Sequence, residues 1–192
     1  MKFRALATLA LVALSAAAWA GDIQGKVTGM NGRSVVYVNE IAGKTFPAPK
    51  DHALMDQKGL MFNPHILVVQ LGATVDFLNS DNVAHNAFWP AIGGDKKAGH
   101  NLGTWPKGEK RPYTFTKSGV VPVFCNVHPE MTGYVIVSPT PYFAETDDSG
   151  DYTIKGVPDG SYTLTAWHEG ARNQSRPITL SGGGKADFTV SK

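Results

Sequence analysis

A lone cysteine between two β-branched runs limits what this chain can fold into more than any other feature. Residues 121–124 lead into the cysteine and residues 133–137 follow it, and both runs have the composition of buried strands. Between them lie Cys125, His128 and Met131, each three residues after the one before. A tight loop between two strands can point a thiolate, an imidazole and a thioether into one small volume. The stretch therefore predicts a β-rich fold that carries a ligand loop.

A second imidazole is needed to complete a site, and His85 can supply it. Residues 71–79 read as a strand that runs into a polar loop ending at His85. Two sulfurs and one imidazole lack the fourth, harder ligand that a structural zinc site requires. Two imidazoles, one thiolate and a weak methionine form instead the trigonal arrangement of blue copper sites. The two segments together indicate one copper ion.

These segments resemble a known family. Cys-x-x-His-Pro-x-Met followed by glycine and a β-run is similar to the ligand loop of amicyanin and its cupredoxin relatives. Asn-x-Asp-x-x-x-His-Asn, which ends at Asn86, is similar to the first-histidine loop of plastocyanin-type domains. The resemblance covers roughly residues 60–138 and implies a Greek-key β-sandwich of the type 1 blue copper class.

The resemblance also implies a role for each site residue. One copper ion would have three equatorial ligands, namely His85, Cys125 and His128. Met131 would be the axial ligand, and Asn86 would brace the two loops without binding the metal. His65, beside a proline at a strand start, is an alternative ligand that we expect to be structural. His100, in the glycine-rich loop 93–100, is the substitute ligand if His85 does not bind.

The cysteine leaves two plainer interpretations open. An exported protein meets oxidising conditions, where a lone thiol invites unwanted disulfides. Cys125 could be an inert buried thiol, or it could form an intermolecular bridge. Neither explains the histidine and the methionine at regular spacing, whereas a metal would hold the sulfur as thiolate and protect it.

Residues 1–20 are expected to be an export signal. Lys2 and Arg4 precede an apolar stretch from Ala5 to Ala17, and residues 18–20 have the small-x-small cleavage pattern, so cleavage is expected before Gly21. The apolar stretch is short for a membrane span. We expect a mature chain without a membrane span, located in the periplasm if the source is a Gram-negative bacterium; the alternative is an uncleaved anchor.

Charge argues against nucleic acid as a partner. Without Lys2 and Arg4, the 18 basic side chains fall to 16, which equals the number of acidic ones. Charged residues make up only 18% of the chain, and glycine and proline are plentiful, as in proteins built from many short strands and turns.

The strands before and after the ligand segments suggest a second β-sandwich. Residues 139–192 alternate turns and strands and resemble carboxypeptidase regulatory-like modules, which are small transthyretin-like sandwiches. Such modules usually begin with a Gly-x-Val-x strand, and residues 25–28 have that pattern. Residues 21–59 can therefore belong to either sandwich, and the cupredoxin portion, residues 60–138, is either inserted or arranged in tandem.

Local patterns add three expectations for the connecting segments. Residues 23–28 and 34–38 are predicted to form a hairpin around an Asn-Gly turn. Residues 52–59 are expected to form a polar loop that holds one helical turn. Residues 138–141, Ser-Pro-Thr-Pro, are typical of a linker.

Two surface features around the ligand segments have a plain and a functional interpretation. Phe88, Trp89 and Trp105 either pack in the core or form an apolar apron around a ligand histidine. A local basic excess is either a solvated face or a docking patch for an acidic redox partner; it comprises Lys96, Lys97, Lys107, Lys110, Arg111 and Lys117.

Three classes of function remain. A full equatorial set with an axial sulfur leaves no open position for a substrate, so we expect an outer-sphere electron carrier and not an enzyme. The resemblance implies a redox partner such as a c-type cytochrome or a periplasmic oxidoreductase. The alternatives are a copper-handling or copper-sensing protein on the same fold, and an enzyme with Cys125 as nucleophile, for which the sequence marks no oxyanion site.

Overall fold

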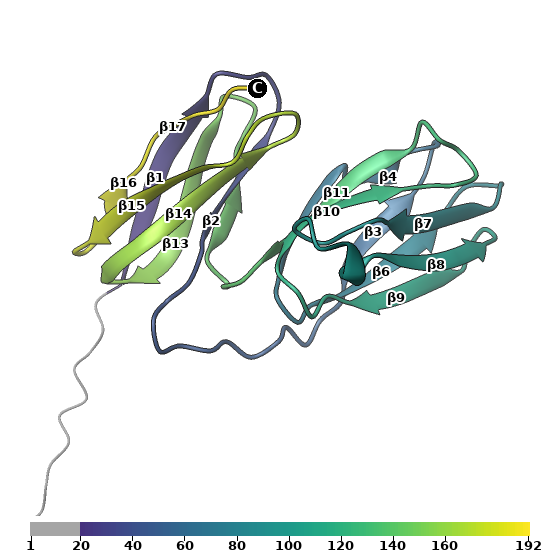
Figure 1. Cartoon of the computed structure of the whole chain (residues 1–192), viewed down its shortest axis with the longest axis horizontal. Coiled ribbons are helices and arrows are strands. Elements are labelled where there is room, and N and C mark those ends of the chain that lie inside the picture. Colours follow the sequence, from purple (N-terminus) through teal and green to yellow (C-terminus); the bar gives the residue numbers. More distant parts are fainter. Residues whose placement is uncertain (1–19) are drawn as a thin grey trace, which may run out of the picture.

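The computed structural model describes residues 20–192, which form two β-sandwiches side by side (Figure 1). The predicted export signal therefore lies almost entirely outside the described residues, and only Ala20 is included, at the start of the first strand. In residues 20–192, no helix has both the length and the apolar composition needed to cross a membrane. The all-β fold class is confirmed, since the described helix is a single 3₁₀ turn, η1 (Lys96–Ala98).

The central sandwich is formed by the middle of the chain. Its five-stranded sheet has the order β5-β11-β10-β7-β8, and its four-stranded sheet has the order β4-β3-β6-β9. The strands are β3 (Ala53–Gln57), β4 (Phe62–Asn63), β5 (Ile66–Gln70), β6 (Thr74–Asn79), β7 (His85–Trp89), β8 (His100–Trp105), β9 (Lys110–Thr114), β10 (Gly119–Phe124) and β11 (Thr132–Ser138).

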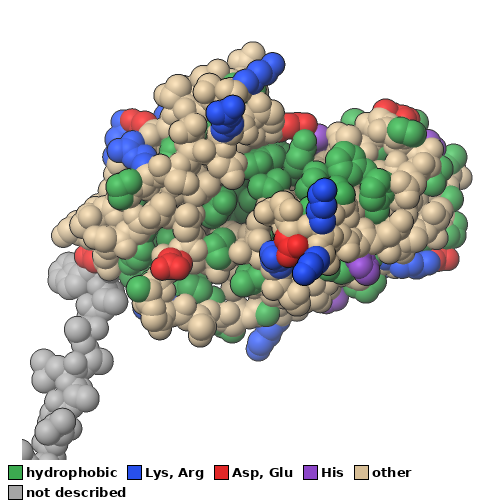
Figure 2. Space-filling view, viewed as in Figure 1, with side chains coloured by type: hydrophobic (Ala, Val, Ile, Leu, Met, Phe, Trp, Pro, Cys, Tyr) green, Lys and Arg blue, Asp and Glu red, His purple; other side chains and the backbone are tan. Residues whose placement is uncertain are grey.

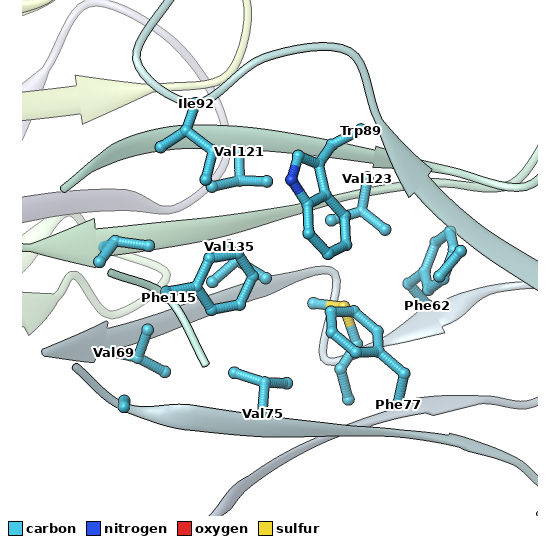
Figure 3. Packing of buried hydrophobic residues seen from close by; sticks show 14 of the residues in the cluster. Phe62, Val69, Val75, Phe77, Trp89, Ile92, Phe115, Val121, Val123 and Val135 are labelled. Carbon is cyan, nitrogen blue, oxygen red and sulfur yellow. The ribbon is translucent and has the colours of Figure 1, made fainter. Parts of the chain in front are cut away.

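Alternating side chains of these strands fill the core between the two sheets. In β10, Val121 and Val123 are fully buried while their neighbours are only partly buried, which is the period of two expected of a strand that covers a core. Aromatic rings from both sheets complete the packing; for example, Phe77 stacks on Trp89 with ring centroids 5.9 Å apart (Figure 3). This core fixes the strand ends from which the candidate ligands project.

The terminal sandwich combines both ends of the described chain. One of its sheets has the order β13-β1-β16, with β17 also paired to β1, and the other has the order β12-β2-β14-β15. The strands are β1 (Ala20–Thr28), β2 (Ser34–Val38), β12 (Phe143–Glu145), β13 (Asp151–Pro158), β14 (Gly160–His168), β15 (Gln174–Leu180), β16 (Gly184–Lys185) and β17 (Phe188–Thr189). The segment 21–59 thus divides between the sandwiches, and the central sandwich lies between β2 and β12 in the chain.

Two local expectations were wrong. β1 and β2 do not form a hairpin, because they lie in opposite sheets and face each other across the core of the terminal sandwich. Gly29 and Gly32, both with positive φ, let the chain cross from one sheet to the other. Residues 52–59 contain the strand β3 and no helical turn, because Met55 and Gln57 point inward and are fully buried.

A small apolar interface joins the two sandwiches. Ile66 and Ile136 of the central sandwich pack with Val35 and Trp167 of the terminal one, and the ring of Trp167 lies 5.0 Å from that of Tyr134. Figure 2 shows hydrophobic side chains where the two lobes meet.

The predicted linker, residues 138–141, is folded into this junction. Ser138 and Thr140 are buried, and the Thr140 hydroxyl donates a hydrogen bond to the carbonyl oxygen of Val38 at 2.9 Å. The connection therefore holds the two sandwiches together through polar contacts as well as through the apolar interface.

Candidate metal centre

The candidate ligands meet at one end of the central sandwich because β7 and β10 are antiparallel neighbours. Phe124, the last residue of β10, pairs with Phe88 near the end of β7, and because the strands are antiparallel the residues after Phe124 run back along β7 toward His85. Cys125 directly follows β10, and His85 is the first residue of β7. Two segments that are far apart in the sequence therefore deliver a thiol and an imidazole to the same place.

A tight turn carries the other two predicted ligands. The backbone N–H of Met131 donates to the carbonyl oxygen of His128 at 3.0 Å, which closes a turn with Pro129 in its second position. Proline favours this position because its ring presets the required φ. The turn ends where β11 begins, so His128 and Met131 are held between two paired strands.

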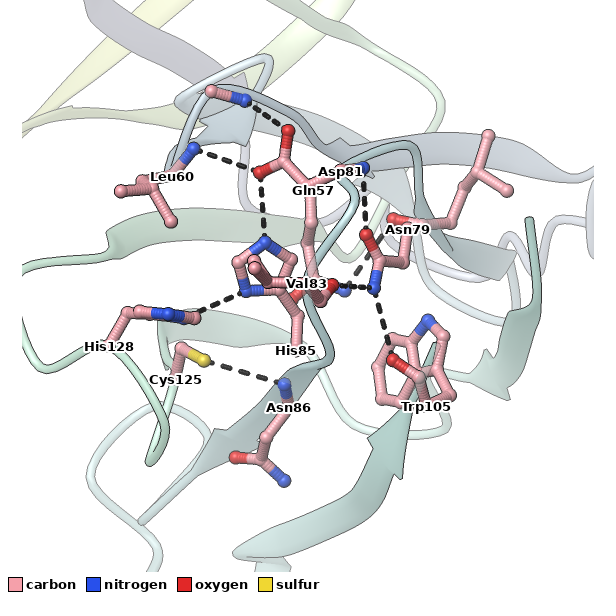
Figure 4. Close-up of polar contacts among 12 residues, drawn as sticks. Gln57, Leu60, Asn79, Asp81, Val83, His85, Asn86, Trp105, Cys125 and His128 are labelled. Carbon is pink, nitrogen blue, oxygen red and sulfur yellow. Dashed lines mark hydrogen bonds and ion pairs between the residues drawn. The ribbon is translucent and has the colours of Figure 1, made fainter. Parts of the chain in front are cut away.

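Three donor atoms converge at this end of the sandwich (Figure 4). One nitrogen each of His85 and His128 and the sulfur of Cys125 all lie within 4.8 Å of one another. The two Nδ1 atoms are 3.0 Å apart. His85 is fully buried, Cys125 is 2% exposed, and His128 alone is partly open to solvent.

Asp81 orients the ring of His85 from the other side. Its Oδ2 lies 2.9 Å from His85 Nε2 and also accepts from the backbone N–H of Leu60 at 3.0 Å, while Oδ1 accepts from the N–H of Gly59 at 2.7 Å. Burial alone would raise the pKa of Asp81, but the two N–H groups and His85 outweigh it and lower the pKa to about 2. Because Nε2 faces this carboxylate, Nδ1 on the opposite side of the His85 ring faces the site and lies 3.0 Å from His128 Nδ1.

Asn86 braces the two loops and part of β8. Its backbone N–H donates to Cys125 Sγ at 3.4 Å, and its Oδ1 accepts from the backbone N–H of Asn126 at 3.2 Å. Its Nδ2 donates to Asn101 Oδ1 at 2.8 Å and to the carbonyl oxygen of Gly103 at 2.7 Å. The backbone N–H of Asn86 is thus a donor aimed at the sulfur, of the kind that tunes a metal-bound cysteine.

Met131 is buried in the same hydrophobic cluster as Cys125 and is 1% exposed. The turn that links it to His128 keeps it next to the converging donors. Its thioether is the weakest of the four candidate donors and would be a weak additional ligand of a bound copper ion.

This donor set fits copper. Ligand bonds of about 2.0–2.3 Å allow atoms this close together to share one first-row metal ion. Thiolate and thioether favour copper over magnesium or calcium, which prefer oxygen ligands. Asp81, the carboxylate that contacts His85, already accepts from two backbone N–H groups and faces Nε2, not the Nδ1 side that faces His128.

The other histidines lie elsewhere in the described residues. His65 is paired with Glu169 of the terminal sandwich at 2.7 Å, and the ring of His100 packs against Tyr113 at 4.8 Å. Neither joins the cluster that His85 forms with Cys125 and His128. A cavity of about 540 Å³ between the two sandwiches is lined in part by His65 and by none of the three converging donors.

Sequence reasoning missed the role of Asp81 and of Asn79. Asn79 is fully buried and shapes the loop before His85, because its Nδ2 donates to the carbonyl oxygens of Val83 and Trp105 at 2.9 and 3.0 Å. Both residues stand in the Asn-x-Asp-x-x-x-His motif. A polar pair just before a ligand histidine was the available signal.

The structure places several residues of the aromatic and basic features, while Phe88 is only partly buried. Trp89 and Trp105 are each 1% exposed and belong to the core, not to an apron. In the basic stretch, three side chains pair with carboxylates: Lys110 with Asp76, Arg111 with Glu109, and Lys117 with Asp95. The local basic excess is therefore partly neutralised.

Comparisons with known proteins agree with this division of the chain. Residues 50–138 match the family described as copper binding proteins, plastocyanin/azurin family. Residues 132–191 match the carboxypeptidase regulatory-like domain. The second match does not include β1 and β2, which come earlier in the chain and complete that sandwich. Among the curated proteins, none matches this chain.

The similar solved structures include variants of amicyanin and a copper-containing nitrite reductase. A Cu(I) form of an amicyanin variant is 25% identical, with 45% of this chain and 82% of that chain covered and a TM-score of 0.42. A reduced form of another amicyanin variant is also 25% identical, with coverages of 47% and 86% and a TM-score of 0.43. A copper-containing nitrite reductase from Thermus scotoductus is 26% identical, with coverages of 52% and 25% and a TM-score of 0.42.

The resemblances found in the sequence are thus confirmed by the family matches. The chain carries a copper-binding domain of the plastocyanin/azurin family at residues 50–138, together with a carboxypeptidase regulatory-like domain.

Proposed function

We propose that this protein is an exported type 1 blue copper protein that carries single electrons between periplasmic redox partners by outer-sphere transfer. The observation that carries the proposal is the convergence of donor atoms of His85, Cys125 and His128 within 4.8 Å, with Met131 buried in the same hydrophobic cluster as Cys125. When bound, copper would supply a one-electron couple between Cu(I) and Cu(II).

The residues of the chain would keep one geometry in both oxidation states. Cu(I) and Cu(II) favour different coordination, so a ligand set that moves little lowers the cost of switching. Asp81 holds His85, and Asn86 ties the loop of Cys125 to β7 and β8. Because these contacts come from separate strands, neither ligand loop can relax independently.

Electrons would enter and leave through the partly exposed edge of His128. Residues 20–192 contain five large apolar side chains with substantial exposure, and four belong to loops at this end of the central sandwich: Leu60, Met61, Val83 and Val127. Leu60 and Val83 lie around the site in Figure 4. Such a rim suits brief contact with a redox protein, for example a c-type cytochrome or a periplasmic oxidoreductase.

An electron carrier fits the donors better than an enzyme does. Two imidazoles, a thiolate and a thioether would leave no coordination position for a substrate, and His85 and Cys125 are shielded from solvent. The export step rests on residues 1–20, whose pattern predicts cleavage before Gly21.

Addition of Cu(II) to the apoprotein tests this function. We expect an intense visible thiolate-to-copper band and an EPR spectrum with narrow copper hyperfine splitting, followed by rapid stopped-flow oxidation of a reduced c-type cytochrome. A colourless protein with weak, exchangeable copper would overturn the carrier function and would favour copper handling or sensing on the same fold. The variant Cys125→Ser is the control and is expected to lack the band.

A further inference from the structure

We infer that Asp81 is a positioning residue for the copper site: its carboxylate fixes the proton of His85 on Nε2 and so presents the Nδ1 lone pair to the metal. The inference rests on the proposed function, because it assumes that His85 binds copper through Nδ1. It concerns a residue with no direct contact to the metal position.

The contacts of Asp81 hold the ring of His85 in one orientation, with Nε2 facing the carboxylate. The side chain of His85 is fully buried, so solvent cannot replace Asp81 as the partner of Nε2. Asp81 is itself only 17% exposed, and its two oxygens accept from Gly59, Leu60 and His85. Rotation of the carboxylate away from His85 would break two backbone hydrogen bonds.

The two histidines therefore have different parts. The Nδ1 atoms of the two rings lie 3.0 Å apart, so both rings turn this nitrogen toward the site. His85 is fully buried and has Asp81 at its Nε2, whereas the ring of His128 is partly open to solvent. Asp81 therefore sets the orientation of His85 before any metal binds.

The orientation of Asp81 comes from a turn next to the site. The turn between β3 and β4 is closed by a hydrogen bond from Lys58 N–H to the carbonyl oxygen of Met61 at 3.0 Å. Within this turn Leu60 has a positive φ of 58°, and its N–H donates to Asp81 Oδ2 at 3.0 Å. A purely structural role, in which Asp81 only holds this turn, is the competing explanation.

The apoprotein separates the two explanations without any metal. In protein labelled with ¹⁵N-histidine, long-range ¹H–¹⁵N spectra distinguish the Nε2–H tautomer from the Nδ1–H tautomer for each ring. We expect His85 to be purely Nε2–H in the wild type and to lose this preference in Asp81→Ala. The control Leu60→Gly alters the same turn but keeps the N–H and the carboxylate, so it should leave the tautomer unchanged.

Copper affinity is the second readout, with copper ions as the probe. Loss of a partner that orients a ligand histidine typically weakens metal binding about 10–100-fold. We expect that loss for Asp81→Ala and less than a twofold change for Leu60→Gly. If Asp81→Ala does not fold, Asp81→Leu provides similar bulk without an acceptor and is judged by the same criteria.

Two results would overturn the inference: a pure Nε2–H tautomer of His85 in the variant that lacks the carboxylate, or equal losses of affinity in that variant and in Leu60→Gly. Failure of the proposed function would look different. In that case the wild type would show no blue band, whereas the tautomer result on the apoprotein would still stand or fall by itself.

Discussion

Replacement of Asn86 by alanine tests how the two ligand loops are held together. The side chain is 2% exposed and makes three hydrogen bonds, to the N–H of Asn126, to Asn101 Oδ1 and to the carbonyl oxygen of Gly103. Each such bond contributes about 1 kcal/mol to stability. Because the partners are near the surface and can bind water after the substitution, we expect Asn86→Ala to lower the free energy of unfolding by about 2–3 kcal/mol.

Urea denaturation of the apoprotein, followed by tryptophan fluorescence, measures this loss. Asn82→Ala is a matched control, because Asn82 lies in the loop just before β7, is exposed, and accepts a hydrogen bond from Lys107 Nζ at 2.8 Å. We expect the control to change stability by less than about 0.5 kcal/mol. The backbone N–H of residue 86 still reaches Cys125 in the alanine variant, so the visible band of the copper protein should persist. Equal stability of the two variants would refute the bracing role.

Three further predictions concern the fold and its pH dependence. Trp167 is the largest ring of the interface between the sandwiches and is 5% exposed. Trp167→Ala should lower the free energy of unfolding by about 3–5 kcal/mol without changing the copper spectrum. A loss below about 1 kcal/mol would contradict this packing role. Gly133→Ala would place a Cβ 2.9 Å from Phe62 Cβ, so we expect the free energy of unfolding to fall by about 1–3 kcal/mol in the same assay. Unchanged stability would mean that Phe62 can move away without cost and would contradict this prediction. The hydrogen bond from Lys110 holds the pKa of Asp76 below its ordinary value of 3.8, so this stabilisation is present above that pH and is lost as pH falls through the lowered pKa. Asp76→Asn should therefore lower the free energy of unfolding at neutral pH and make it fall less steeply as the pH is lowered. Equal steepness of this fall in variant and wild type would contradict the prediction.

The ligand loop was predictable because its geometry is local. Cys125, His128 and Met131 lie within seven residues between two β-branched runs, and Pro129 favours the turn that joins them. The contact of this loop with His85 was harder to predict, because His85 is distant in the sequence. That prediction depended on a strand that ends in a polar loop and on the family motif. The pairing of β7 with β10 is the physical reason that the two segments meet.

Features that depend on distant pairing were not predictable. The pattern of residues 23–38 describes two strands equally well in one hairpin or in two opposed sheets, and only pairing with β13 and β14 decides. The strand β3 was hidden because it ends in Asp56 and Gln57, polar residues that read as a loop although Gln57 is fully buried. Asp81 was missed because two of its three partners come from Gly59 and Leu60, in a turn far from it in the sequence.

The most direct measurement of the copper site is X-ray absorption at the copper K edge of the loaded protein. The structure predicts one close sulfur neighbour from Cys125 and two nitrogen neighbours from His85 and His128 in both oxidation states. The close sulfur should be absent in Cys125→Ser. A wild-type spectrum with only nitrogen and oxygen neighbours would contradict the account.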